Sequence, residues 1–141
     1  MNIIDYASYF HDGIVHDIKH EGDKLEISME SAELLPEWNE NNIVISERNT
    51  ICGNLHLEKI SKIMMDEKLF EEPITKNYDD GNIYHFAICE NKLLLEMSWE
   101  NYPPKPREET DVFTIQIEAE KIYWENIPTL FDEYWDSLAK E

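Results

Sequence analysis

The sequence has few glycines, few cysteines and few basic residues, and each shortage argues against a class of function. Its four glycines form no GxGxxG or GxxxxGK[ST] motif, which argues against a phosphate-binding loop. Its two cysteines, Cys52 and Cys89, match no zinc-ligand spacing. Twelve basic residues against 31 acidic ones give a formal net charge of −19. Nucleic acid and anionic membranes are polyanions, so this charge disfavours direct binding to either.

Long hydrophobic runs are missing as well. No apolar stretch approaches the roughly 18 residues that a membrane-spanning helix needs. The residues from Met1 to Asp5 reach an acid at once and carry no basic region, so we expect no signal peptide. We expect a cytoplasmic protein with reduced thiols, in which Cys52 and Cys89 act as small buried hydrophobic residues. The sequence alone leaves a bridge between these two cysteines open.

Apolar and aromatic residues are well represented. Hydrophobic residues make up 42% of the chain, with four Trp, seven Tyr and five Phe, which is typical of a folded domain despite the charge. A length of 141 residues suits one domain with its own core, and no repeat divides it. The excess of acids favours cationic partners and speeds their encounter, although solubility is an equally simple reason for it.

Alternation of apolar and polar residues predicts a first hairpin around Gly22-Asp23. Glycine tolerates positive φ at the first central position of a two-residue turn, so residues 14–20 and 24–30 become the two strands. The expected cross-strand pairs are Ile18 with Ile27 and His16 with Met29.

A second hairpin is predicted around Glu90-Asn91, between residues 83–89 and 92–99. Its expected pairs, which with Trp99 form one apolar face, are Ile88 with Leu93, Phe86 with Leu95, and Tyr84 with Met97. Loops are expected at 32–42, 71–81 and 102–109.

Further strands and a terminal helix complete the prediction. Strands are expected at 43–45, 50–58 and 112–120, the last extended to residue 124. Residues 58–66 fit a bulged strand or a short helix, and the bulge is favoured. A helical stripe is formed by Ile127, Leu130, Phe131, Tyr134, Trp135 and Leu138. The predicted fold class is α+β: a mainly antiparallel, meandering β-sheet with a C-terminal amphipathic helix packed on it.

The segment from His11 to His20 holds three of the five histidines and suggests chemistry. A metal or catalytic site here would use His11, Asp12 and His16, because imidazole and carboxylate groups ligate zinc or iron. His16 and His20 lie about 13 Å apart along a strand, too far to share one ion. A structural role is favoured. Asp12 would accept backbone hydrogen bonds in a turn before Gly13, and His16 would be a hydrogen-bonded core histidine.

Aromatic and acidic side chains in or beside the predicted loops form the remaining candidate site. Aromatic residues are enriched in the hot spots of protein interfaces. The simpler alternative is that they belong to the core and to solvated loops. The residues expected at a partner-binding site are Trp38, Glu71, Glu72, Asp79, Asp80, Trp99, Tyr102, Glu108, Glu109 and Asp111.

Short motifs follow one another along most of the chain. The motif Phe10-His11-Asp12-Gly13-x-Val15-x-x-Ile18 precedes an alternating strand, and Gly53-x-Leu55-x-Leu57 follows before a late pair of strands. This arrangement resembles a group of small uncharacterised bacterial domains, some of them similar to the immunity proteins encoded beside polymorphic toxins. The resemblance implies a meandering sheet and an acidic domain that occludes the basic active-site cleft of a nuclease toxin. It supplies no catalytic residue that could be transferred to this chain.

We therefore expect a non-enzymatic single domain, residues 1–141, that binds another, basic protein and neutralises it as an immunity protein does. We expect no cofactor or metal, no nucleic-acid or membrane partner, and a monomer or a weak homodimer formed through a sheet edge. The alternative is a small metal-dependent hydrolase or ligand-binding domain that uses His11, Asp12 and His16.

Overall fold

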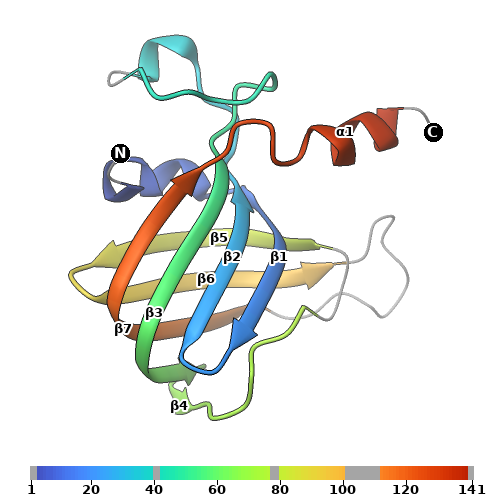
Figure 1. The fold of residues 1–141 in the computed structure, drawn as a ribbon. Coiled ribbons are helices and arrows are strands. Elements are labelled where there is room, and N and C mark those ends of the chain that lie inside the picture. The colour runs from blue at the N-terminus through green and yellow to red at the C-terminus, as the bar shows by residue number, and fades with distance from the viewer. Residues whose placement is uncertain (1–2, 40–41, 77–79, 101–111, 140–141) are drawn as a thin grey trace.

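A closed barrel of six antiparallel strands forms the body of the protein (Figure 1). The computed structural model describes residues 3–39, 42–76, 80–100 and 112–139. The strands are β1 (Ile14–Glu21), β2 (Lys24–Glu30), β3 (Cys52–Met65), β5 (Asp80–Cys89), β6 (Lys92–Glu100) and β7 (Phe113–Asn126), with a two-residue strand β4 (Lys68–Leu69) beside the end of β3. The helical segments are the 3₁₀ helices η1 (Ile3–Phe10) and η2 (Pro36–Trp38) and the α-helix α1 (Asp132–Ala139).

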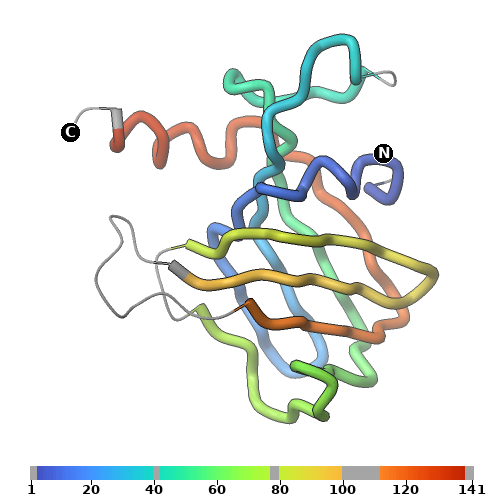
Figure 2. The backbone as a smooth tube through the Cα atoms, turned by 180° about the vertical axis from the view of Figure 1, so that it is seen from behind, coloured from blue at the N-terminus to red at the C-terminus, as the bar shows by residue number. Residues whose placement is uncertain are grey.

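The predicted α+β class with an open, meandering sheet is wrong. Strands account for 53% of the described residues and helices for 15%. The strands pair in the order β2-β1-β5-β6-β7-β3, and a further pairing of β2 with β3 closes the ring. β7 makes the closure possible because it serves both sides of the barrel: residues 113–118 pair with β6, and residues 115–126 pair with β3. Figure 2, seen from the opposite side to Figure 1, shows β5 and β6 crossing the barrel in front of the steeper strands.

The first predicted hairpin is confirmed, with one change of register. Ile18 faces Ile27 as expected, and Glu21 and Lys24 close the turn. A bulge after Val15 places that residue opposite Met29, so the expected pairing of His16 with Met29 is wrong. The bulge turns His16 away from the position inside the sheet that simple alternation assigned to it.

The second hairpin carries a bulge of the same kind. Ile88 faces Leu93 and Phe86 faces Leu95, as expected. A register shift after Ile83 places Ile83 opposite Met97, in the position predicted for Tyr84. Tyr84 is instead exposed on the barrel surface.

Two shorter predictions are also decided by the structure. Residues 58–65 continue β3 as a strand with a bulge between Ile60 and Lys62, and residue 66 begins a turn. The predicted short strand at 43–45 is wrong, because these residues have no regular secondary structure.

The barrel interior is filled by apolar side chains. η1 closes one end, where the ring of Phe10 contacts the rings of Phe86 at 5.1 Å and Trp124 at 5.6 Å between centroids. The largest fully buried side chains on the strands are Ile27, Met29, Leu55, Leu57, Ile83, Leu93, Leu95, Met97 and Ile115. The inside of the barrel is therefore a packed core.

Of the six strand pairings that close the barrel, the one between β1 and β5 has the fewest residue pairs, and we call it the seam. Only Ile14 with Asn82 and Val15 with Gly81 pair across it, beside two flanking backbone hydrogen bonds to Ile83. Further along β1, the ring of His20 accepts a hydrogen bond from the backbone N–H of Ile74, so the chain at Ile74 lies beside this edge.

The C-terminal helix is shorter than predicted and packs differently. Residues 128–131 form turns, and α1 begins only at Asp132. Figure 1 shows α1 at the same end of the barrel as η1 and η2, where it does not lie across an apolar sheet face. None of the helices in the described part of the chain is long and apolar enough to cross a membrane.

Candidate functional site

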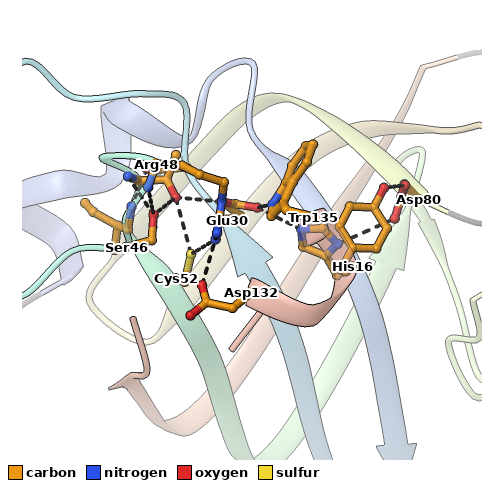
Figure 3. A network of polar contacts seen from close by, with 12 residues as sticks. His16, Glu30, Ser46, Arg48, Cys52, Asp80, Asp132 and Trp135 are labelled. Atoms are coloured by element: carbon orange, nitrogen blue, oxygen red, sulfur yellow. Dashed lines mark hydrogen bonds and ion pairs between the residues drawn. The ribbon is translucent and has the colours of Figure 1, made fainter. Parts of the chain in front are cut away.

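A buried network of polar side chains joins α1 to the outer face of the barrel (Figure 3). Its centre is Glu30, the last residue of β2, which is only 1% exposed. Glu30 follows the inward-facing Met29, so strand alternation directs its side chain outward. The C-terminal segment covers it there. We call the network the α1 clasp; its members are His16, Glu30, Arg48, Asp80, Phe131, Asp132, Tyr134 and Trp135.

The carboxylate of Glu30 is surrounded by donors. It accepts hydrogen bonds from Thr50 Oγ1 at 2.5 Å, Trp135 Nε1 at 2.8 Å and Arg48 Nε at 3.1 Å. His16 Nε2 lies 3.1 Å from its Oε1. Burial raises the pKa of Glu30, but these hydrogen bonds and the charge of Arg48 outweigh burial and lower the pKa to about 2. Glu30 is therefore a carboxylate at neutral pH.

His16 lies between two carboxylates and two aromatic rings. Its Nε2 faces Glu30 at 3.1 Å and its Nδ1 faces Asp80 Oδ1 at 3.6 Å. Phe131 stacks on the imidazole at 3.8 Å between centroids, and Tyr134 contacts it edge-on while donating to Asp80 Oδ2 at 2.7 Å. Burial lowers the pKa of His16, but Asp80 and Glu30 outweigh it and raise the pKa above 6.5. The site favours the imidazolium form.

Arg48 completes the clasp from the loop between β2 and β3. Its Nη1 donates to Asp132 Oδ1 at 3.1 Å, and its guanidinium lies 5.7 Å from the ring centroid of Trp135. Its Nη2 is 3.7 Å from Cys52 Sγ. Burial raises the pKa of the Cys52 thiol to about 11, so this cysteine is not a thiolate nucleophile at neutral pH. Both cysteines are free; Cys52 is buried as expected, whereas Cys89 is exposed.

The clasp attaches α1 to the barrel and favours the protonated form of His16. It leaves little access for a substrate to the imidazole ring. His16 is 7% exposed, and Phe131 and Tyr134 cover its ring. The prediction of a buried, hydrogen-bonded histidine is confirmed, although His16 lies beneath α1 and not inside the barrel. Asp132 lies outside the apolar stripe predicted for the C-terminal helix and is bound to Arg48.

The three residues of the predicted metal or catalytic set do not come together. His11 and Asp12 are exposed, with His11 Nε2 3.7 Å from Asp12 Oδ2, whereas His16 is enclosed in the clasp. His11 Nδ1 contacts the backbone oxygen of Tyr84. Within the described ranges, the group of three residues whose ligand atoms lie within 4.8 Å of one another is instead Glu26, His56 and Glu125.

The structure separates the residues predicted to bind a partner. Trp38 is 45% exposed in η2, while Glu71 and Glu72 are exposed near β4 at the opposite end of the barrel (Figure 1). Trp99 is buried in the core and Asp80 belongs to the clasp. Asp79, Tyr102, Glu108, Glu109 and Asp111 lie outside the described residues.

Glu30, Arg48 and Trp135 were not predicted from the sequence to form a unit. Alternation alone makes Glu30 a solvent-facing residue of a hairpin, and the helix that covers it comes from the other end of the chain. One signal was available: Arg48 is the only Lys or Arg between Lys24 and Lys59. A lone cation in so acidic a segment indicates a specific carboxylate partner.

A second feature at the same end of the barrel is a surface that combines exposed apolar and acidic side chains. Trp38 stacks on Tyr9 of η1 at 6.0 Å between centroids, which joins the loop after β2 to the N-terminal cap. We call it the capped-end surface. Its exposed apolar residues are Ile4, Leu35, Trp38 and Val44, and its exposed acids are Asp5, Glu33, Glu37 and Glu47.

No protein-family model, curated protein or solved structure matches this chain.

Proposed function

We propose that this protein binds another, basic protein through the capped-end surface and acts without catalysing a reaction, as an immunity protein does when it neutralises a toxin. The observation that carries the proposal is the exposure of large apolar side chains among acids at one end of the barrel. Trp38 is 45% exposed and Val44 is 67% exposed there. Tryptophan is enriched among the hot spots of protein interfaces.

Electrostatics support a basic partner. The formal charge of −19 generates a negative potential around the molecule, which accelerates the approach of a cationic protein and repels polyanions. From residue 31 to residue 51, which includes most of the capped-end surface, Arg48 is the only basic residue, and it is engaged with Glu30 and Asp132. Little positive charge is thus available at this end to weaken the attraction.

The alternative of a metal-dependent hydrolase at His11, Asp12 and His16 has less support. His16 already contacts Glu30 and Asp80 beneath the aromatic rings of the clasp. Use of His16 in catalysis would require α1 to leave the barrel, and the ligands nearest in sequence, His11 and Asp12, are solvent-exposed.

The test is binding to the products of the genes that flank the gene of this protein, measured by calorimetry. We expect one of them to be a basic toxin that forms a 1:1 complex. Trp38→Ala should weaken the complex by about 2 kcal/mol, or roughly thirtyfold, because interface tryptophans are frequent hot spots. Affinity should also fall as salt rises, because screening reduces the attraction.

The matched control is Leu69→Ala, which removes a 60% exposed side chain at the opposite end of the barrel. It should leave the affinity unchanged. The proposal is wrong if neither flanking product binds, or if Trp38→Ala, shown by circular dichroism to be folded, binds as tightly as the wild-type protein.

A further inference from the structure

Three neighbouring strands bring one histidine and two glutamates together on the outer face of the barrel. Glu26 on β2 lies directly opposite His56 on β3, and His56 lies directly opposite Tyr123 on β7. Glu125 is two positions further along β7 on the same face, opposite Asn54. The three side chains are therefore placed by the register of a closed sheet, which is a rigid support for ligands.

The histidine faces a carboxylate on each side of its ring. His56 Nε2 lies 2.9 Å from Glu125 Oε1, and His56 Nδ1 lies 3.8 Å from Glu26 Oε1. One ligand atom from each of the three residues falls within 4.8 Å of the other two. Ligand atoms about 2.1 Å from one tetrahedral zinc ion lie about 3.4 Å apart. Binding of one ion requires side-chain rotations that turn both carboxylates toward the same imidazole nitrogen.

Neighbouring side chains hold these ligands in place. Tyr123 stacks on the imidazole of His56 with 4.7 Å between centroids and 14° between planes. Asn54 Nδ2 donates to Glu125 Oε1 at 3.3 Å. Such contacts to the ligands restrict ring and carboxylate rotation, which is how outer residues support a metal centre. A cavity of about 240 Å³ opens beside the group, and its lining includes Glu26 and His56 but not Glu125.

We propose that Glu26, His56 and Glu125 bind one divalent transition-metal ion of the zinc type. The donor set combines one imidazole nitrogen with carboxylate oxygens, a mixture that suits zinc better than Mg²⁺ or Ca²⁺, which prefer oxygen alone. With His56 neutral, the two carboxylates carry the charge that balances a dication. Three protein ligands leave a fourth position for water or an exchangeable ligand.

The site shares no residue with the capped-end surface or with the α1 clasp. Its existence is independent of the proposed protein-binding function, and either can fail without the other.

The experiment is a calorimetric titration of EDTA-treated protein with ZnCl₂, compared among single variants. We expect one zinc ion per chain in the wild-type protein. His56→Ala and Glu125→Gln should each weaken zinc binding about tenfold or more, because each removes a ligand. Co²⁺ bound in place of zinc should give visible absorption bands that His56→Ala lacks.

An acidic protein also attracts cations without a defined site, and the control addresses this. Glu120→Gln removes one negative charge from the same strand at an exposed position outside the group. It should bind zinc within twofold of the wild-type protein. The proposal is overturned if His56→Ala binds zinc within threefold of the wild-type protein, or if Glu120→Gln weakens binding as much as Glu125→Gln does.

Discussion

Glu30 is the residue on which the attachment of α1 depends. Its carboxylate contacts side chains from β1, from the loop before β3 and from α1, and it is almost fully buried. A buried carboxylate is stable only when its hydrogen bonds are made, and here four partners converge on it. Its removal therefore affects several segments at once.

Glu30→Gln should lower the free energy of unfolding at pH 7 by about 3 kcal/mol, because Arg48 and His16 lose the buried charge that compensates them. Urea denaturation monitored by tryptophan fluorescence measures the change. The control is Glu33→Gln, an exposed acid close by, which should change stability by less than about 0.5 kcal/mol. If Glu30→Gln also changed the free energy of unfolding by less than about 0.5 kcal/mol, Glu30 would not be the residue that attaches α1.

The same variant should remove part of the sensitivity of the fold to acid. The pKa of Glu30 is lowered from 4.5 to about 2, so its contribution is complete above pH 4.5 and is lost as the pH falls toward 2. This shift in pKa corresponds to about 3 kcal/mol of the free energy of unfolding. The stability difference between wild type and Glu30→Gln should therefore shrink from pH 5 to pH 2, and a constant difference would contradict the assignment.

α1 is the element whose packing differs most from its prediction. An apolar stripe suggested burial against a sheet face, but only Phe131, just before the helix, is buried, while Tyr134 and Trp135 attach the helix through hydrogen bonds. Phe131 stacks on His16, and hydrogen bonds and an ion pair surround this contact. It is thus more easily opened than the strands of the barrel.

Phe131→Ala should release α1 while the barrel stays folded. Loss of a buried phenylalanine commonly costs about 3 kcal/mol, and most of its contact here is with the clasp. Amide hydrogen exchange should become at least about tenfold faster in residues 132–139 and remain unchanged in the pairing between β3 and β7. Equal acceleration in both regions would show that α1 is part of one cooperative unit with the barrel.

The strands could be predicted because the alternation of apolar and polar residues is a local pattern. Their registers could not be predicted in full because of bulges. Both hairpins were found from their turns, yet each carries a bulge that shifts the pairs beyond it, at Val15 in one and at Ile83 in the other. No residue type marks these bulges in the sequence. The bulge between Ile60 and Lys62 was expected because the alternation itself breaks near Lys59-Ile60.

The barrel as a whole depends on pairings between distant segments. The pairing of β2 with β3 crosses a long loop, and the pairing of β3 with β7 joins segments still further apart. The periodicity of a segment does not indicate which distant strand it pairs with, which explains why closure of the barrel was not predicted. The clasp and the group of Glu26, His56 and Glu125 were missed for the same reason, since each gathers residues from several strands or from both ends of the chain.

Net charge acts on the whole molecule, and added salt should stabilise it. At pH 7 the formal charge is −19, and the excess carboxylates repel one another in the folded barrel. Raising NaCl from about 20 mM to about 300 mM shortens the screening length from about 20 Å to about 6 Å, so the melting temperature should rise. Near pH 4.4, the isoelectric point, the same salt should have little effect. Calorimetry measures both, and equal salt effects at the two pH values would contradict this explanation.

The seam between β1 and β5 has a consequence for how fast this chain can fold. The two hairpins are local and can form early, but the seam joins segments far apart in sequence through only two residue pairs. The entropy of closing so long a loop opposes this step until the rest of the core is assembled. Formation of the seam is therefore expected late in folding. Although its hairpins are local, we expect this chain to fold at the slow rate typical of proteins whose pairings are mostly non-local.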